Sequence, residues 1–174
     1  RWARRITGAH ATLEAGAAAV AGDLALWDVA ECRIRGALVE ARQCDDLIGV
    51  VSILWTLDML VRDRVDAHVI GLFTRAEEVG LVGAAAIAAS DVLPKNALVV
   101  AVECSSAAGG RAEQGGGPVI RVGDIGHIFS PRMSMWMTQV AREMQAADPA
   151  FRFQRKLMDG GTTEATAYDL MGYE

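Results

Sequence analysis

Apolar positions recur at a helical spacing in four parts of the chain. From residue 47 onward they fall three or four positions apart, as on one face of a helix, and the same spacing returns further along. Ser130 suits an N-cap position and Pro131 the first helical position that follows it. The helices predicted in this way span residues 47–64, 81–90, 130–145 and 164–171.

Short apolar runs between these helices have the length of β-strands. Residues 67–74 and 97–102 are nearly continuous apolar runs, which are typical of strands buried on both faces of a parallel sheet. Looser patterns predict further strands at 24–29, 33–41, 118–122 and 151–157. Because strands and helices alternate, we expect an α/β fold with a mostly parallel, doubly wound sheet and helices on both faces.

The composition indicates a globular protein and excludes several classes of partner. Of the 174 residues, 52% are hydrophobic and 22% are charged, and the net charge is -5. An acidic chain argues against general nucleic-acid binding, and no apolar run approaches the length of about 18 residues that spans a membrane. Cys32, Cys44 and Cys104 include no CxxC pair, which favours thiols in a reducing compartment and a cytoplasmic location.

Acidic residues fall at the ends of three predicted elements. Asp45-Asp46 precedes a helix, Glu77-Glu78 follows a predicted strand, and Glu103 ends another. Since ligands gather at the carboxyl ends of parallel strands, we expect these groups to meet at one edge of the sheet. Clustered carboxylates repel one another unless a cation lies between them, and carboxylate oxygens suit zinc, cobalt or manganese.

Each acidic site also has an ordinary explanation. Adjacent acidic residues such as Asp45-Asp46 and Glu77-Glu78 are common at solvated helix starts, where the helix dipole favours negative charge. Glu103 alone fits an ordinary loop carboxylate. Composition and spacing therefore leave the metal site open.

Several segments, in a fixed order, resemble the motifs of one family. The most specific is FTRAEEVGLVGA at residues 73–84, which is similar to the pattern FT-x-x-EEVGLxGA. Residues 22–49, with Gly-Asp at their start and ARQCDDLIG at their end, match a second motif, and the segments 101–103, 115–124 and 160–162 complete the series. On these residues the chain resembles the glutamyl and deblocking aminopeptidases, two-metal peptidases whose members form tetrahedral particles.

The resemblance implies a role for each acidic residue. Asp45 would bridge two divalent metal ions, zinc, cobalt or manganese, and Asp46 would be joined to it by a cis peptide bond. Glu77 would be the general base that activates water. Glu78 would bind one metal and Glu103 the other, on a three-layer sandwich like that of zinc peptidases.

The chain departs from the family pattern in two places. The family usually has Asp where Glu103 stands, and its GGTDA segment here reads Gly160-Gly161-Thr162-Thr163-Glu164-Ala165, whose first three residues would contact substrate. The family also needs two histidine ligands, and the histidines at positions 10, 68 and 127 match neither place. We therefore expect a fragment of the catalytic domain that is inactive by itself.

These expectations define a main hypothesis and a rival. The main one is the core of a metal-dependent aminopeptidase that removes N-terminal residues from peptides and forms a homo-oligomer as a complete enzyme. Residues 1–22 would be the remnant of an inserted domain that helps to build the particle, and residues 23–174 a partial catalytic domain. The rival is a non-catalytic module of the same fold that acts in assembly or in weak cation or ligand binding.

Overall fold

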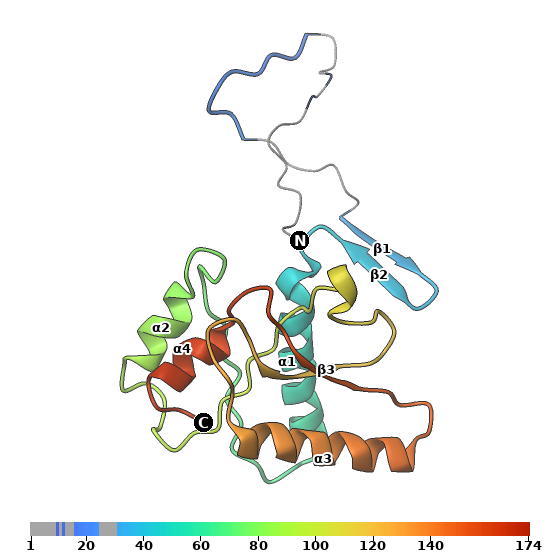
Figure 1. Cartoon of the computed structure of the whole chain (residues 1–174), viewed down its shortest axis with the longest axis vertical. Helices are drawn as coiled ribbons and strands as arrows, with labels where there is room; N and C mark the ends of the chain where they lie inside the picture. Colours follow the sequence, from blue (N-terminus) through green and yellow to red (C-terminus); the bar gives the residue numbers. More distant parts are fainter. Residues whose placement is uncertain (1–9, 11, 13–15, 25–30) are drawn as a thin grey trace. The chain divides into compact units, whose positions relative to one another are not determined.

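The structure is a computed structural model that describes residues 10, 12, 16–24 and 31–174 (Figure 1). The chain divides into two units, Arg1–Arg42 and Gln43–Glu174. The first unit holds an antiparallel hairpin of β1 (Cys32–Arg35) and β2 (Leu38–Ala41), in the region where a strand was predicted at 33–41. The strand predicted at 24–29 lies outside the described residues except for its first position. A domain boundary after residue 22 stays a prediction.

The second unit contains all four predicted helices. Their ends lie within three residues of the predicted ones, and Ser130 caps the third helix by accepting a hydrogen bond from the Met133 N–H at 3.2 Å. Across the described part of the chain, no helix combines the length and apolar character that a bilayer crossing requires. The helices are α1 (Cys44–Arg62), α2 (Val82–Ala88), α3 (Pro131–Ala147) and α4 (Glu164–Leu170), with a 3-10 turn, η1 (Ala108–Gly110).

A parallel β-α-β arrangement lies in the second half of this unit. Strand β3 (Val119–Gly123) pairs in parallel with β4 (Gln154–Leu157), and α3 connects them and packs against β3. Both strands were predicted, and the α/β class is confirmed. The larger doubly wound sheet is not formed within the described residues, because segments 67–74 and 97–102 belong to no strand. An apolar run indicates burial, but a strand also requires a hydrogen-bonded neighbour.

The buried core of the unit lies where α2 meets α4. Ala84 and Ala88 are fully buried, and their small side chains allow α2 to approach Ala167 and Tyr168 of α4. The ring of Tyr168 meets that of Tyr173 edge to face, with centroids 6.0 Å apart. This packing fixes the position of α4, whose first residue reaches the cavity described below.

Asp124 joins the loop after β3 to the start of α4. Its side chain is buried, and Oδ1 accepts hydrogen bonds from the N–H groups of Gly126 at 2.7 Å and His127 at 2.9 Å. Oδ2 accepts from the Thr163 N–H at 2.8 Å and the Thr166 hydroxyl at 2.7 Å. Burial alone would raise the pKa of Asp124, but these hydrogen bonds together lower it.

We predict that Asp124→Asn destabilises this unit. An asparagine amide would face N–H donors that now meet a carboxylate, so the free energy of unfolding should fall by about 2–4 kcal/mol. The folded-state pKa of Asp124 is lowered. Its contribution to the free energy of unfolding is therefore fully present above the ordinary aspartate pKa, and it is lost as the pH falls through the folded-state pKa. Chemical denaturation of the two proteins at neutral and acidic pH measures the difference.

Asp58→Asn is the matched control for this substitution. Asp58 lies exposed on α1, so its replacement should change the free energy of unfolding by at most about 0.5 kcal/mol. Equal effects of the two substitutions would contradict the role assigned to Asp124.

Candidate metal centre

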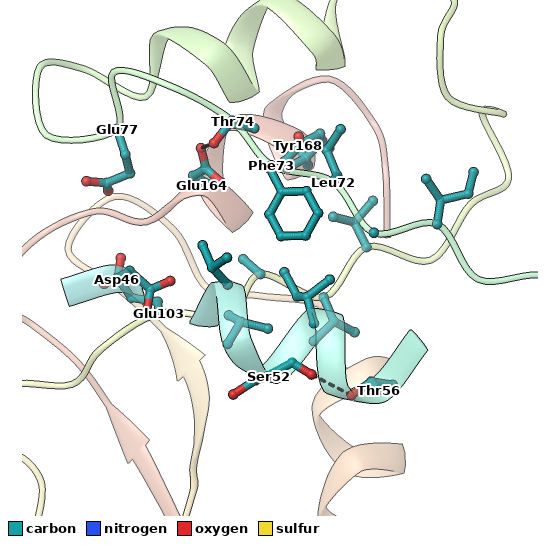
Figure 2. Close-up of a pocket in the computed structure, with 18 of the residues that line it drawn as sticks. Asp46, Ser52, Thr56, Leu72, Phe73, Thr74, Glu77, Glu103, Glu164 and Tyr168 are labelled. Carbon is teal, nitrogen blue, oxygen red and sulfur yellow. Dashed lines mark hydrogen bonds between the residues drawn. The ribbon is translucent and has the colours of Figure 1, made fainter. Parts of the chain in front are cut away.

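A cavity of about 1000 Å³ opens in the second unit between α1, residues 68–78 and residues 93–103. Figure 2 shows Asp46 and Glu103 near the start of α1, with Glu77 and Glu164 across the cavity from them. No lysine or arginine is among the described residues that line it. The carboxylates that line it are those of Asp45, Asp46, Glu77, Glu78, Glu103 and Glu164.

The start of α1 presents Asp45 and Asp46 to this cavity. The peptide bond between them is cis, as the resemblance implied, and both residues lie outside helical backbone geometry. Asp46 Oδ1 accepts a hydrogen bond from the Gly49 N–H at 2.9 Å, which caps the regular part of the helix. A Cβ at position 49 would lie 2.1 Å from Asp46 Oδ2, so the glycine allows the carboxylate to fold over the helix start.

A tight turn places Glu77 and Glu78 at the cavity. The Glu77 carbonyl accepts hydrogen bonds from the N–H groups of Gly80 at 3.1 Å and Leu81 at 2.9 Å. A Cβ at Gly83 would lie 2.6 Å from the backbone oxygen of Arg75, so the start of α2 can approach the turn only with glycine there. The spacing within the EEVGLVG motif therefore follows from the turn that carries its two carboxylates.

Glu103 is half-buried at the end of the segment 97–102. Burial, followed by the negative charges of Asp45 and Glu77, raises its pKa to about 7, although the nearby Arg121 acts in the opposite direction. Arg121 extends from β3 and donates hydrogen bonds to the Cys104 carbonyl and, at 3.2 Å, to Ser105 Oγ. This arginine ties the end of the segment to the parallel strand pair.

The pKa of Glu77 is also raised, for the same two reasons as that of Glu103. Burial raises its pKa, and the charges of Glu78, Glu164, Asp45 and, more weakly, Asp46 raise it further. Burial, and after it the neighbouring negative charges, disfavour the charged forms of Glu77 and Glu103, and a divalent cation in the cavity would offset both effects. The residues present therefore fit oxygen-ligated divalent metal ions.

Cys104 is a member of this site that the sequence did not indicate. Its Sγ lies 3.6 Å from Asp46 Oδ1 and 3.3 Å from the Cys44 carbonyl oxygen, so the two acceptors share the single S–H donor. Burial and then the charges of Asp45 and Asp46 raise its pKa to about 11. Ligand atoms of Asp45, Asp46 and Cys104 lie within 4.8 Å of one another, whereas Glu78 and Glu103 stand outside that closest group. Only the fold reveals this proximity, since no motif singles out the cysteine.

Other expected or candidate residues lie away from the carboxylates. The Gly161 carbonyl accepts a hydrogen bond from the Ile125 N–H at 3.2 Å, and neither it nor Gly160 or Thr162 lines the cavity. The substrate contact predicted for these three residues gains no support from their positions. Among the described residues the closest group of ligand atoms includes no histidine: His68 lines the cavity but is exposed, and His127 lies against Asp169.

Comparison with known proteins identifies the family. Residues 7–174 match the family model of the M42 glutamyl aminopeptidases, so the chain belongs to that family. None of the curated protein sequences matches it.

All three cysteines lie in the described part of the chain, and none forms a disulfide.

Solved structures that resemble the chain include the following two. PhTET1-12s, described as a dodecamer in the asymmetric unit, is 30% identical and superposes with a TM-score of 0.62 over 79% of this chain and 41% of its own. Aminopeptidase APDkam598 from the archaeon Desulfurococcus kamchatkensis is 28% identical, with a TM-score of 0.61 over 80% and 39%. The chain thus spans about two fifths of the length of these relatives.

We predict that Glu103→Gln stabilises the metal-free chain increasingly as pH rises. The folded-state pKa of Glu103 is raised. Its favourable contribution to the free energy of unfolding is therefore fully present below the ordinary glutamate pKa, and it is lost as the pH rises through about 7. Glutamine carries no charge at any pH. In thermal unfolding with a chelator present, the midpoint temperature of the variant should rise relative to that of the parent chain between about pH 5 and about pH 8.

Glu113→Gln is the control for that measurement, because Glu113 is exposed and lies outside the cavity lining. It should show no comparable dependence on pH. An offset between Glu103→Gln and the parent chain that stays constant with pH would contradict the electrostatic account of the site.

Proposed function

We propose that this chain supplies the carboxylate part of the metal centre of an aminopeptidase that hydrolyses N-terminal residues from peptides. The observation that carries the proposal is the meeting of Asp45, Glu77, Glu78 and Glu103 around a cavity with no lysine or arginine in its described lining. These residues come from separate parts of the chain, and the chain belongs to the M42 glutamyl aminopeptidase family.

Asp45, Glu78 and Glu103 would hold two divalent metal ions, with Asp45 between them. Their donors are oxygens, which suits zinc, cobalt or manganese. When bound, such ions lower the pKa of water and polarise the carbonyl group that is attacked. Asp46, whose Oδ1 already accepts from Gly49 and Cys104, would hold the neighbouring Asp45 in position.

Glu77 would act as the general base. Its carboxylate is half-buried at the cavity, and its raised pKa lies nearer to neutrality than that of an ordinary glutamate. A base with such a pKa can take a proton from the attacking water and return it to the departing amine. The substrate would be a peptide whose first residue enters the cavity.

The complete protein would be a homo-oligomer that works on peptides, by analogy with relatives of about twice this length. The cysteines, which form no disulfide, suit the reducing cytoplasm. Because the closest group of ligand atoms in the described residues holds no histidine, we propose that the 174-residue chain alone binds metal weakly and lacks hydrolytic activity.

Zinc binding by the 174-residue chain tests the proposed ligand set. We expect weak binding by calorimetry, and Glu78→Gln should weaken it about tenfold by removing one charge-assisted ligand. Asp58→Asn on the exposed face of α1 should leave it unchanged. Tight binding of two zinc ions would show that the ligand set is already complete, and unchanged affinity in Glu78→Gln would favour the non-catalytic alternative.

Hydrolysis by the complete protein tests the role of Glu77. Release of aniline from leucyl and glutamyl anilides should require a divalent metal. Glu77→Gln should lower kcat by about 10²–10⁴-fold, the usual contribution of a general base, while metal content stays the same. Glu113→Gln serves as the control. An active Glu77→Gln variant with full metal content would remove Glu77 from the mechanism.

A further inference from the structure

Cys104 places a sulfur atom beside the carboxylates of the proposed metal centre. Within the described residues, the ligand atoms of Asp45, Asp46 and Cys104 lie within 4.8 Å of one another. Cys104 also directly follows Glu103, which the proposed ligand set already includes. Zinc contacts thiolate sulfur at about 2.3 Å and carboxylate oxygen at about 2.0–2.2 Å, so atoms this close can share one ion after small side-chain movements.

Polar contacts hold this sulfur and its neighbouring carboxylate in place. Arg121 extends from β3 and donates hydrogen bonds to the Cys104 carbonyl and to Ser105 Oγ, which fixes the backbone that carries the thiol. The Gly49 N–H donates to Asp46 Oδ1 at 2.9 Å. The sulfur is thus held through β3 and the carboxylate through α1, and the two groups face each other.

The thiol has more acceptors around it than it has protons. Its Sγ lies 3.3 Å from the Cys44 carbonyl oxygen and 3.6 Å from Asp46 Oδ1, but a thiol has a single proton to donate. A divalent ion between the sulfur and the carboxylates would contact several donor atoms at once and offset their negative charges. The arrangement of these donor atoms therefore suits a shared cation.

A sulfur ligand changes which metal ion such a centre prefers. Thiolate is a soft ligand that suits zinc, whereas carboxylate and water suit manganese and magnesium. The closest group of ligand atoms in the described part of the chain contains no histidine. Within this group, the sulfur of Cys104 is therefore the donor that can distinguish zinc from manganese.

We propose that Cys104 is a ligand of the metal ion beside Asp45 and that its sulfur makes the centre bind zinc in preference to manganese. The inference rests on the proposed function and adds a sulfur atom to its oxygen ligands. On binding, the S–H bond is replaced by a bond between Sγ and the ion, and the proton passes to solvent. If the thiol served only to donate to Asp46 Oδ1, no bond between metal and sulfur would form.

Cobalt absorption detects a metal–sulfur bond without requiring catalysis. Co²⁺ stands in for zinc, and a cobalt–thiolate bond gives a charge-transfer band in the near ultraviolet that oxygen ligands do not give. The reference protein is Cys32→Ser/Cys44→Ser, which keeps Cys104 as its only thiol and retains the backbone carbonyl at position 44. In oxygen-free buffer, we expect the band to grow and saturate together with the bound cobalt, which equilibrium dialysis counts.

Adding Cys104→Ser to the reference protein removes the sulfur and keeps a hydroxyl donor of similar size. The band should disappear, and zinc affinity should fall about tenfold with the loss of one soft ligand, while manganese affinity changes less than about twofold. Glu113→Gln in the same background is the control and should change neither property.

Two further measurements guard against a variant that does not fold. Circular dichroism spectra that match the spectrum of the reference protein establish that each variant is folded. The cadmium-113 NMR shift of the reference protein, which moves strongly when sulfur binds the metal, needs no substitution at position 104. We expect that shift to report sulfur in the ligand set.

The outcomes separate this inference from the peptidase proposal. Bound cobalt without the band, or a band that persists after Cys104→Ser, overturns the inference and leaves the carboxylate ligands as proposed. Equal losses of zinc and manganese affinity in Cys104→Ser overturn the selectivity. The carboxylate ligands are tested separately by Glu78→Gln, which should weaken zinc binding whether or not the band is present. An absence of bound cobalt at saturating concentration would contradict both proposals.

Discussion

Repulsion among carboxylates around one cavity is the constraint on which the site depends. Two such charges about 4 Å apart repel by about 4 kcal/mol at an effective dielectric constant near 20. The cavity lining offers no lysine or arginine among the described residues. The pKa of Glu103 rises to about 7, first because the side chain is buried and then because of the charges of Asp45 and Glu77. A fold that brings these groups together without a cation loses stability, and this cost is the physical reason for the proposal that they bind a metal.

The backbone that surrounds the cavity is built to tolerate this arrangement. Gly49 lets the Asp46 carboxylate fold over the start of α1, and Gly83 lets α2 approach the turn that bears Glu77. Arg121 ties the end of the segment carrying Glu103 to β3, and Asp124 ties the loop after β3 to α4. Polar contacts and close backbone approaches thus position Asp46, the turn that bears Glu77 and the end of the segment that carries Glu103.

The sequence predicted the helices well because their apolar spacing and capping residues are local. It predicted β3 and β4, but not the absence of pairing at 67–74 and 97–102, since pairing depends on a neighbour that no local pattern specifies. The convergence of the carboxylates of the DD and EEVG motifs was predicted from their places at the ends of elements, and they do line one cavity. The role of each residue came from the family resemblance and stays a prediction. Cys104 and Glu164 were missed because their proximity to Asp46 and Thr74 arises only from the fold.

The central claim is that these carboxylates share divalent cations, and anomalous X-ray diffraction from crystals of the chain grown with zinc or cobalt tests it most directly. The account predicts metal peaks in the cavity, coordinated by oxygens of Asp45, Glu78 and Glu103, with the Glu77 carboxylate beside them. Peaks confined to other parts of the surface, or a well-ordered cavity without metal at saturating concentration, would contradict it.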